Sequence, residues 1–140
     1  MLGKLIGRLF EGRAGAPPRL RGAPAVRRQK TYSAQTGYVY QYYYEGYRES
    51  KRGEARGCEY VFHVSADRKT SFPLTVFLPA AAVQGWERGH GRPLSATEQY
   101  AAAKMALFQT FDEREGLGAA TSEVEIDAPA LEAHLTKLDT

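Results

Sequence analysis

Three groups of side chains in this sequence are suited to binding or chemistry, and the first lies in a glycine-rich loop. Residues 84–93 contain Trp86, Arg88, His90 and Arg92 among three glycines. The segment precedes the expected start of a helix, where free backbone amides attract negative charge, so it is a candidate anion or partner site. The alternative is a glycine-bent connection in which Trp86 fills the edge of the core.

Lys104 forms the second group. In a helical projection it lies between Tyr100 and Phe108, in the middle of the face that we expect to pack on the core. A lysine taken out of water has a lowered pKa and could form a Schiff base or bind an anion. Alternatively, its aliphatic stem packs on the aromatic rings while the ammonium group reaches solvent or meets a carboxylate.

Tyrosines form the third group, in a segment rich in strand-forming residues. If residues 38–47 are extended, one face carries Tyr38, Tyr40, Tyr42 and Tyr44, and the other carries Val39, Gln41, Tyr43, Glu45 and Tyr47. Tyr43 and Tyr47 could then stack on nucleic-acid bases or form a contact patch for a protein. The alternative is that tyrosine is simply a good strand former that tolerates partial exposure.

Sequence signatures of catalysis and metal binding are missing. The chain has no P-loop, no dinucleotide-binding glycine motif, no nucleophile elbow and no C-x-x-C or H-E-x-x-H motif. The spacing of His63, His90 and His134 does not group them with Cys58 as metal ligands. Cys58 falls on the apolar face of a strand pattern, where cysteine is usually a core residue. We assign no catalytic residue, cofactor or metal, and favour a non-enzymatic protein.

Three strands are predicted to position these groups. Apolar residues alternate with polar ones over residues 38–47, 58–64 and 72–78, and the charged residues 48–57 suit a long hairpin connection. The expected apolar face is made by Cys58, Tyr60, Phe62 and Val64 together with Phe72, Leu74, Val76 and Leu78. His63 falls on the opposite face, next to Glu59 and Val61.

A long helix is predicted to cover the apolar face of this sheet. Ser95 and Glu98 have the spacing of a capping box, so the helix should begin at Ala96 and end near residue 115, before Gly116. The projection places Leu107 and Phe111 on the covered side, and Ala102 and Ala106 on the other side. Before this helix, residues 80–86 are expected to form one helical turn.

The expected fold is therefore α+β, with a three- to four-stranded antiparallel sheet packed against one long helix over residues 31–118. A flexible basic N-terminal extension, residues 1–30, precedes this domain. A C-terminal tail, residues 119–140, is expected to hold a short strand at Val124 and Ile126 and a helix over residues 129–138 capped by Asp127.

The positive charge of the chain is concentrated in that N-terminal extension. Residues 1–30 carry eight Lys and Arg against one Glu, a charge of +7, which leaves 11 basic and 15 acidic residues, a charge of −4, in residues 31–140. Leu2, Leu5, Ile6, Leu9 and Phe10 recur at the spacing of an apolar helical face, and residues 13–30 are a Gly/Pro/Arg linker. This pattern is typical of a docking peptide or of a targeting peptide.

The helix segment Ala101-Ala102-Ala103-Lys104-Met105-Ala106-Leu107, which follows three antiparallel strands, resembles the last helix of the double-stranded-RNA-binding domain. That resemblance implies a fold of a helix, three strands and a helix. Near Ser95 to Ala101, where the family carries a basic cluster, this chain has Glu98 and no Lys or Arg. The resemblance therefore indicates only the order of the secondary-structure elements.

The leading hypothesis is a small non-enzymatic interaction module, tethered by its N-terminal peptide to a protein partner, a scaffold or an anionic membrane surface. The alternative is a nucleic-acid-binding accessory domain that uses the Arg-rich tail for phosphates. No apolar run is long enough to cross a membrane. A single cysteine cannot form an internal disulfide and fits a reducing compartment, so we expect a cytoplasmic location.

Overall fold

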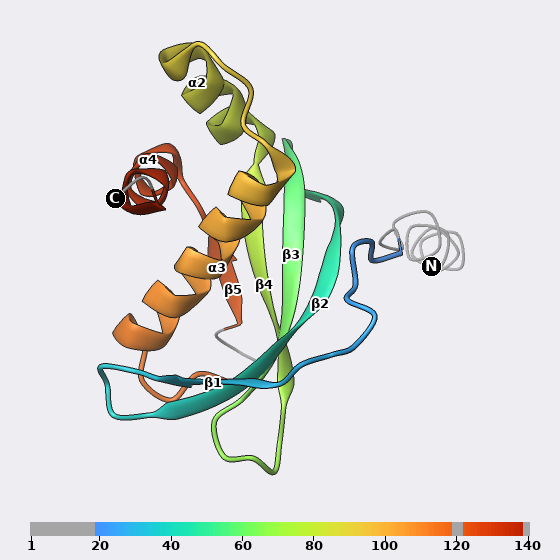
Figure 1. Cartoon of the computed structure of the whole chain (residues 1–140), viewed down its shortest axis with the longest axis vertical. Helices are drawn as coiled ribbons and strands as arrows, with labels where there is room; N and C mark the ends of the chain where they lie inside the picture. The colour runs from blue at the N-terminus through green and yellow to red at the C-terminus, as the bar shows by residue number, and fades with distance from the viewer. Residues whose placement is uncertain (1–18, 119–121, 139–140) are drawn as a thin grey trace, which may run out of the picture.

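The computed structural model describes residues 19–118 and 122–138, which form an α+β fold (Figure 1). Its elements are β1 (Lys30–Ser33), β2 (Val39–Arg52), β3 (Ala55–Ser65), β4 (Phe72–Pro79), α2 (Ala80–His90), α3 (Ala96–Glu113), β5 (Glu123–Glu125) and α4 (Ala128–Leu138). The predicted docking peptide lies outside the described residues.

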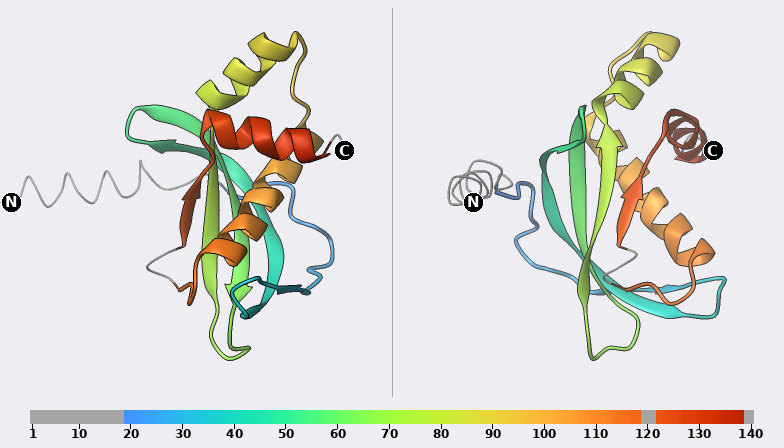
Figure 2. Two further views of the ribbon diagram at one scale, coloured as in Figure 1. Left: turned by 90° about the vertical axis from the view of Figure 1, so that its left-hand side faces the viewer. Right: turned by 180° about the vertical axis from the view of Figure 1, so that it is seen from behind.

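The sheet has five strands in the order β1-β2-β3-β4-β5, and it curls around α3 (Figures 1 and 2). All neighbours are antiparallel except β4 and β5, which pair in parallel. The predicted sheet of three to four antiparallel strands is therefore incomplete. The chain reaches β5 only after crossing back through α2 and α3, and such a crossover returns the strand in the same direction. Strand β1 has only four residues, which is too short for an alternation of apolar and polar residues to be recognised in the sequence.

The predicted hairpin connection over residues 48–57 is wrong, because most of it is strand. β2 continues to Arg52 and β3 begins at Ala55, so only Gly53 and Glu54 form the turn. Gly53 has a φ of 63°, a left-handed conformation that suits glycine. Charged residues continue the strands because they pair across the hairpin, as Arg48 does with Glu59.

A β-bulge between Tyr44 and Gly46 changes which face the tyrosines occupy. The register shifts by one residue there, so Tyr44 pairs with Phe62 and Tyr47 pairs with Tyr60. Both pairs therefore lie on the inner face, and the prediction that Tyr47 shares the outer face with Tyr43 is wrong. Gly46 allows this with a φ of 135°, and a Cβ there would lie 2.7 Å from the carbonyl oxygen of Arg21.

Helix α3 begins as predicted and ends at Glu113. The Ser95 hydroxyl accepts the Glu98 amide at 3.1 Å, and the Glu98 carboxylate accepts the Ser95 amide at 3.1 Å, which completes the capping box. Ala102 and Ala106 are buried with Leu107 and Phe111, contrary to the predicted solvent side. Helix α4 packs against α3 in addition to the sheet, so a wider face of α3 is buried than a sheet alone would cover.

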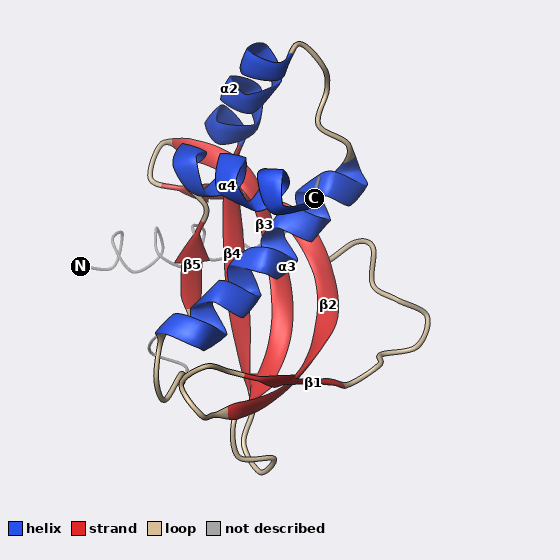
Figure 3. Ribbon diagram, turned by 60° about the vertical axis from the view of Figure 1, so that its left-hand side comes forward, coloured by secondary structure: helices blue, strands red, loops and turns tan. Residues whose placement is uncertain are grey.

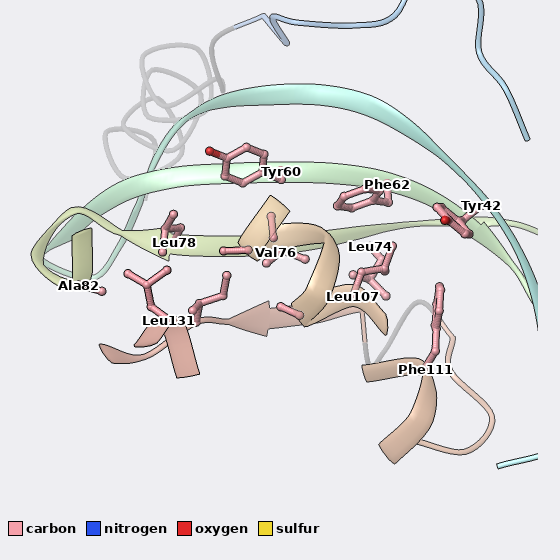
Figure 4. Close-up of a cluster of buried hydrophobic side chains, with 14 of the residues drawn as sticks. Tyr42, Tyr60, Phe62, Leu74, Val76, Leu78, Ala82, Leu107, Phe111 and Leu131 are labelled. Atoms are coloured by element: carbon pink, nitrogen blue, oxygen red, sulfur yellow. The ribbon is translucent and has the colours of Figure 1, made fainter. Parts of the chain in front are cut away.

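The core lies between the inner face of the sheet and the helices (Figure 4). Its strand residues are those predicted from alternation, among them Tyr42, Tyr60, Phe62, Leu74, Val76 and Leu78. The described chain has two helices besides α3: the predicted turn over residues 80–86 is the longer helix α2, and the predicted C-terminal helix is α4, which packs against α2 and α3. Asp127 caps α4 as predicted, since its carboxylate accepts the Ala130 amide at 2.9 Å.

Residues from the predicted C-terminal tail add to this core, and one of them titrates. His134 in α4 is buried, and burial lowers the pKa of its imidazole, with Lys137 acting in the same direction and Asp127 opposing. As the pH falls below the ordinary pKa of 6.5, His134 takes up a proton in the unfolded chain before it does so in the folded chain. Stability should therefore fall as the pH drops below 6.5, by at most about 1.4 kcal/mol per pH unit from this group.

Urea denaturation at pH 7.5 and 5.5 tests this expectation, with His134→Gln as the variant that cannot titrate. The acid-induced loss of stability should be smaller in His134→Gln than in the natural protein. His90, an exposed histidine on α2, supplies the control substitution His90→Gln. An equal loss in natural and His134→Gln proteins would show that His134 is not the group responsible.

Candidate binding site on the outer face of the sheet

The outer face of the sheet carries buried residues, among them Val61 and Phe77, together with residues that reach solvent. Helices α3 and α4 lie on the inner side and α2 extends beyond the end of β4, so none of the described helices covers the outer face (Figures 2 and 3). A hollow of about 450 Å³ lies on this face, where β1, β2 and β3 meet the turn between β3 and β4. Its lining includes Gln41, Tyr43, His63, Arg68, Lys69 and Ser71.

Strand register brings the central residues of the hollow together. Gln41 in β2 lies between Thr31 of β1 and Ser65 of β3, and Tyr43 lies opposite His63. Because side chains alternate along a strand, Gln41, Tyr43 and His63 all point to the outer face. Gln41 and Tyr43 were expected on this face, and so was His63, but no pattern in the sequence indicated that they meet.

Tyr43 is held between two neighbours. Its ring stacks on the His63 imidazole, with centroids 5.2 Å apart. The Arg27 guanidinium also lies over the Tyr43 ring, 5.7 Å from its centroid. Arg27 also lies 3.9 Å from a carboxylate oxygen of Glu45, and 60% of its side chain is exposed. Desolvation and Glu45 raise the pKa of the Tyr43 hydroxyl, so this side chain stays neutral at physiological pH.

Gln41 is the unusual residue of the hollow. It is only 5% exposed, and its Oε1 is buried without a hydrogen-bond partner. A buried amide oxygen left unpaired costs about 1–3 kcal/mol. Rotation of the amide about its last torsion exchanges Oε1 and Nε2, so the side chain can present either a donor or an acceptor to the hollow.

The turn between β3 and β4 supplies two cations to the rim. The Asp67 carboxylate accepts the backbone amides of Lys69 and Thr70, each at 2.8 Å, and these bonds lower the pKa of Asp67 to about 2. Arg68 has a φ of 64°, a left-handed conformation uncommon for a side chain of this size. Within the described ranges, no carboxylate lies within ion-pair distance of Arg68 or Lys69.

His63 also contacts the hydroxyl group of Ser71. Its Nε2 lies 2.7 Å from the Ser71 hydroxyl, the spacing of a base and a nucleophile. Such a pair normally needs a carboxylate that orients the imidazole. The described part of the chain places no carboxylate within 4.0 Å of His63, where the stacked Tyr43 ring fixes the imidazole instead. The arrangement is better suited to binding than to acyl transfer.

The prediction of a glycine-rich loop over residues 84–93 is wrong for most of that segment, because residues 84–90 belong to α2, and the side chains of the predicted site mainly pack on one another. Trp86 is 7% exposed, its ring stacks on His90 at 4.1 Å, and the Arg92 guanidinium lies 4.7 Å from its centroid. His90 in turn contacts Glu132 of α4 at 2.8 Å. Arg92 donates to Glu98 at 3.0 and 2.8 Å. Arg88 is exposed on α2 and lines a separate hollow of about 350 Å³.

Lys104 lies on the inner side, away from the outer-face hollow. It is partly buried, and its Nζ lies 5.9 Å from the Phe108 ring centroid. Burial and then the neighbouring ammonium of Lys30 lower the pKa of Lys104. Within the described residues no carboxylate lies within ion-pair distance of Lys104, so the carboxylate contact that the second interpretation allowed is not formed there.

A larger groove, about 1150 Å³, lies at the hairpin end of the sheet. Four of the charged groups that line it pair with each other: Glu59 binds Arg48 and Arg52, and Arg52 also lies 3.1 Å from Glu123. In contrast to Gln41, none of its lining residues has a buried polar side-chain atom left without a hydrogen bond. The outer-face hollow is for this reason the stronger candidate.

Of the predicted partner-binding residues, Tyr43 lies in the hollow, Tyr47 lies on the inner face, and the five apolar residues of the N-terminal peptide lie outside the described ranges. Sequence reasoning missed Gln41, His63, Arg68, Lys69 and Ser71 as site residues. The alternation pattern already placed the first two on the outer face. Comparison with protein-family models, curated proteins and solved structures found no match to this chain.

Proposed function

We propose that this protein is a small non-enzymatic interaction module whose folded domain binds its partner through the outer face of the sheet. The observation that carries the proposal is the buried Gln41 amide, left without a partner at an open polar hollow. A folded protein rarely leaves a buried polar atom unpaired, so such an atom beside an open hollow favours a ligand that completes the bond.

The chemistry of the remaining candidate groups supports a binding role. Cys58 is half-buried, and burial raises the pKa of its thiol, so little reactive thiolate forms near neutral pH. The Arg92 and His90 side chains are engaged with Glu98 and Glu132. None of the helices in the described ranges has the length and apolar character needed to span a bilayer.

The N-terminal peptide is the proposed tether of this module. Its support is the sequence pattern: an apolar helical face that includes Leu5 and Leu9, flanked by Lys4 and Arg8. In the full chain, Leu5→Asp with Leu9→Asp should abolish recovery with the tethering partner or with anionic vesicles. Lys4→Gln with Arg8→Gln should weaken vesicle binding in a salt-dependent way and spare an apolar protein contact.

A pull-down with the full chain tests the outer face itself. Partners captured by the natural protein should be lost from Tyr43→Ala and retained by Tyr38→Ala, an exposed tyrosine outside the hollow. Circular dichroism before the pull-down verifies that both variants are folded. If folded Tyr43→Ala captures every partner as well as Tyr38→Ala does, the outer face is not the binding surface.

A further inference from the structure

The hollow on the outer face combines three kinds of group in a fixed arrangement. An amide that can donate or accept lies at Gln41, an aromatic ring lies at Tyr43, and two cations lie at Arg68 and Lys69 on the turn. A ligand that uses all of them must be planar, must carry hydrogen-bonding edges, and must be anionic at one end.

We propose that this hollow binds one nucleotide unit, with the base against Gln41 and Tyr43 and the phosphate against Arg68 and Lys69. The inference rests on the proposed function, since it names the ligand class of the same surface. The unit could belong to a free mononucleotide or to a single-stranded nucleic acid, because both present the same base and phosphate. The volume of about 450 Å³ falls within the range of small-molecule sites.

Gln41 matches the edge of a base. Nucleic-acid bases carry adjacent donor and acceptor atoms, and a glutamine amide is complementary to such a pair, as in glutamine–adenine contacts. Because Oε1 of Gln41 has no partner within the described chain, a bond from the ligand replaces an unmet one and displaces no existing protein bond.

Tyr43 provides the stacking surface. One neighbour, His63, is a strand residue that fixes the ring, and the other, Arg27, belongs to an exposed segment outside the strands. The Arg27–Glu45 contact of 3.9 Å is a surface ion pair and contributes little to holding Arg27 in place. A base can therefore replace the guanidinium on the Tyr43 ring, or Arg27 can stack on the far side of the base.

Charge sets the direction of the ligand. Glu45 lies beside Arg27 at the Tyr43 end, where it would repel a phosphate, whereas the turn presents Arg68 and Lys69 without carboxylate partners in the described chain. Asp67, the acid of that turn, has its carboxylate bound to backbone amides. The phosphate therefore belongs at the turn and the base at Tyr43.

Titration of the full chain, followed by two-dimensional NMR, tests the inference. The probes are the four common ribonucleoside monophosphates, the matching nucleosides, inorganic phosphate alone, and single-stranded oligonucleotides of about ten bases. At least one monophosphate should shift the Gln41 side-chain amide and the His63 ring signals. It should bind about tenfold tighter than its nucleoside or than phosphate alone, since each lacks one of the two contacts.

Matched variants sharpen the test. Gln41→Met keeps the volume and removes the amide, so it should be at least as stable as the natural protein while binding about tenfold more weakly. Tyr43→Ala should weaken binding by a similar factor, and Lys69→Gln should weaken binding of monophosphates but not of nucleosides. Lys51→Gln, an exposed lysine on the hairpin, should leave binding unchanged.

Each outcome decides a different point. Tighter, strongly salt-dependent binding of oligonucleotides than of monophosphates assigns the unit to a single-stranded nucleic acid, and equal affinities assign it to a free nucleotide. Equal binding of phosphate and monophosphates, or no shift at Gln41 at millimolar concentrations, overturns the inference. If nucleotides fail while Tyr43→Ala still loses captured proteins, the outer face binds a protein and the proposed function stands. If both fail, the proposed function falls as well.

Discussion

Replacing Phe111 with alanine should lower the free energy of unfolding by about 3–5 kcal/mol. Phe111 is 0% exposed, and its ring stacks on Tyr40 with centroids 4.3 Å apart and planes 9° apart. Tyr40 is itself 0% exposed, so the sheet and α3 meet at this pair (Figure 4 shows Phe111 on its helix). Removal of the ring leaves a cavity that these rigid neighbours cannot fill, and lost burial adds to the cost of the cavity.

Urea denaturation monitored by circular dichroism measures this loss. Phe108→Ala is the matched control, because the same substitution on the same helix removes a ring that is only partly buried. Phe108 stacks on Tyr32 at 4.6 Å and meets Tyr42 edge-on at 5.8 Å, so the control loses two aromatic contacts but leaves a more open gap that solvent enters. A loss at Phe111 no larger than that at Phe108 would contradict the central position of the Tyr40–Phe111 pair.

Replacing Glu59 with glutamine should cost about 3 kcal/mol, the lower end of the range for breaking a buried ion pair. Glu59 is 6% exposed, binds Arg48, and accepts from Arg52 at 2.9 Å. Glutamine keeps the size but leaves Arg48 without its counter-charge and leaves Arg52 with only the exposed carboxylate of Glu123. Their side chains are 24% and 31% exposed, so partial hydration holds the cost at that lower end.

The pH dependence separates this ion network from simple packing. Burial alone would raise the pKa of the Glu59 carboxyl, but Arg48 and Arg52 outweigh burial and hold it below the ordinary value of 4.5. The contribution of Glu59 is therefore complete above pH 4.5 and is lost as the pH falls through the lowered pKa. The stability difference between natural protein and Glu59→Gln should shrink in acid.

Glu123 supplies the control for Glu59. It also contacts Arg52, at 3.1 Å, but its side chain is 67% exposed. Because water screens an exposed pair, Glu123→Gln should cost about 0.2–1 kcal/mol. Similar costs for Glu59→Gln and Glu123→Gln would mean that water screens the whole ion network.

Local patterns predicted the main elements of the fold because their causes act within a few residues. The capping box needs only Ser95 and Glu98, three residues apart, and the cap of α4 needs only Asp127 and the amide of Ala130. The inner-face residues of β3 and β4 follow from alternation alone, since a strand has a period of two. The same alternation placed Gln41 and Tyr43 on the outer face.

Long-range pairing explains what the patterns missed. β1 and β5 are short and acquire their structure only by bonding to β2 and β4, and Tyr47 changes face because β2 bulges at Gly46 against β3. The charged residues 48–52 remain in strand because their partners lie on β3.

The sequence by itself determined the α+β class, the start of the main helix and the inner face of the central strands. The predicted flexible linker is wrong for its described part, because Arg21 pairs with Tyr47 of β2 and β1 begins at Lys30. Only the tertiary structure decided that Gln41, Tyr43 and His63 share one hollow with Arg68 and Lys69. The physical reason is that alternation specifies which face a side chain occupies, whereas its neighbours depend on strand register. Register depends on the summed pairing and packing of the whole sheet.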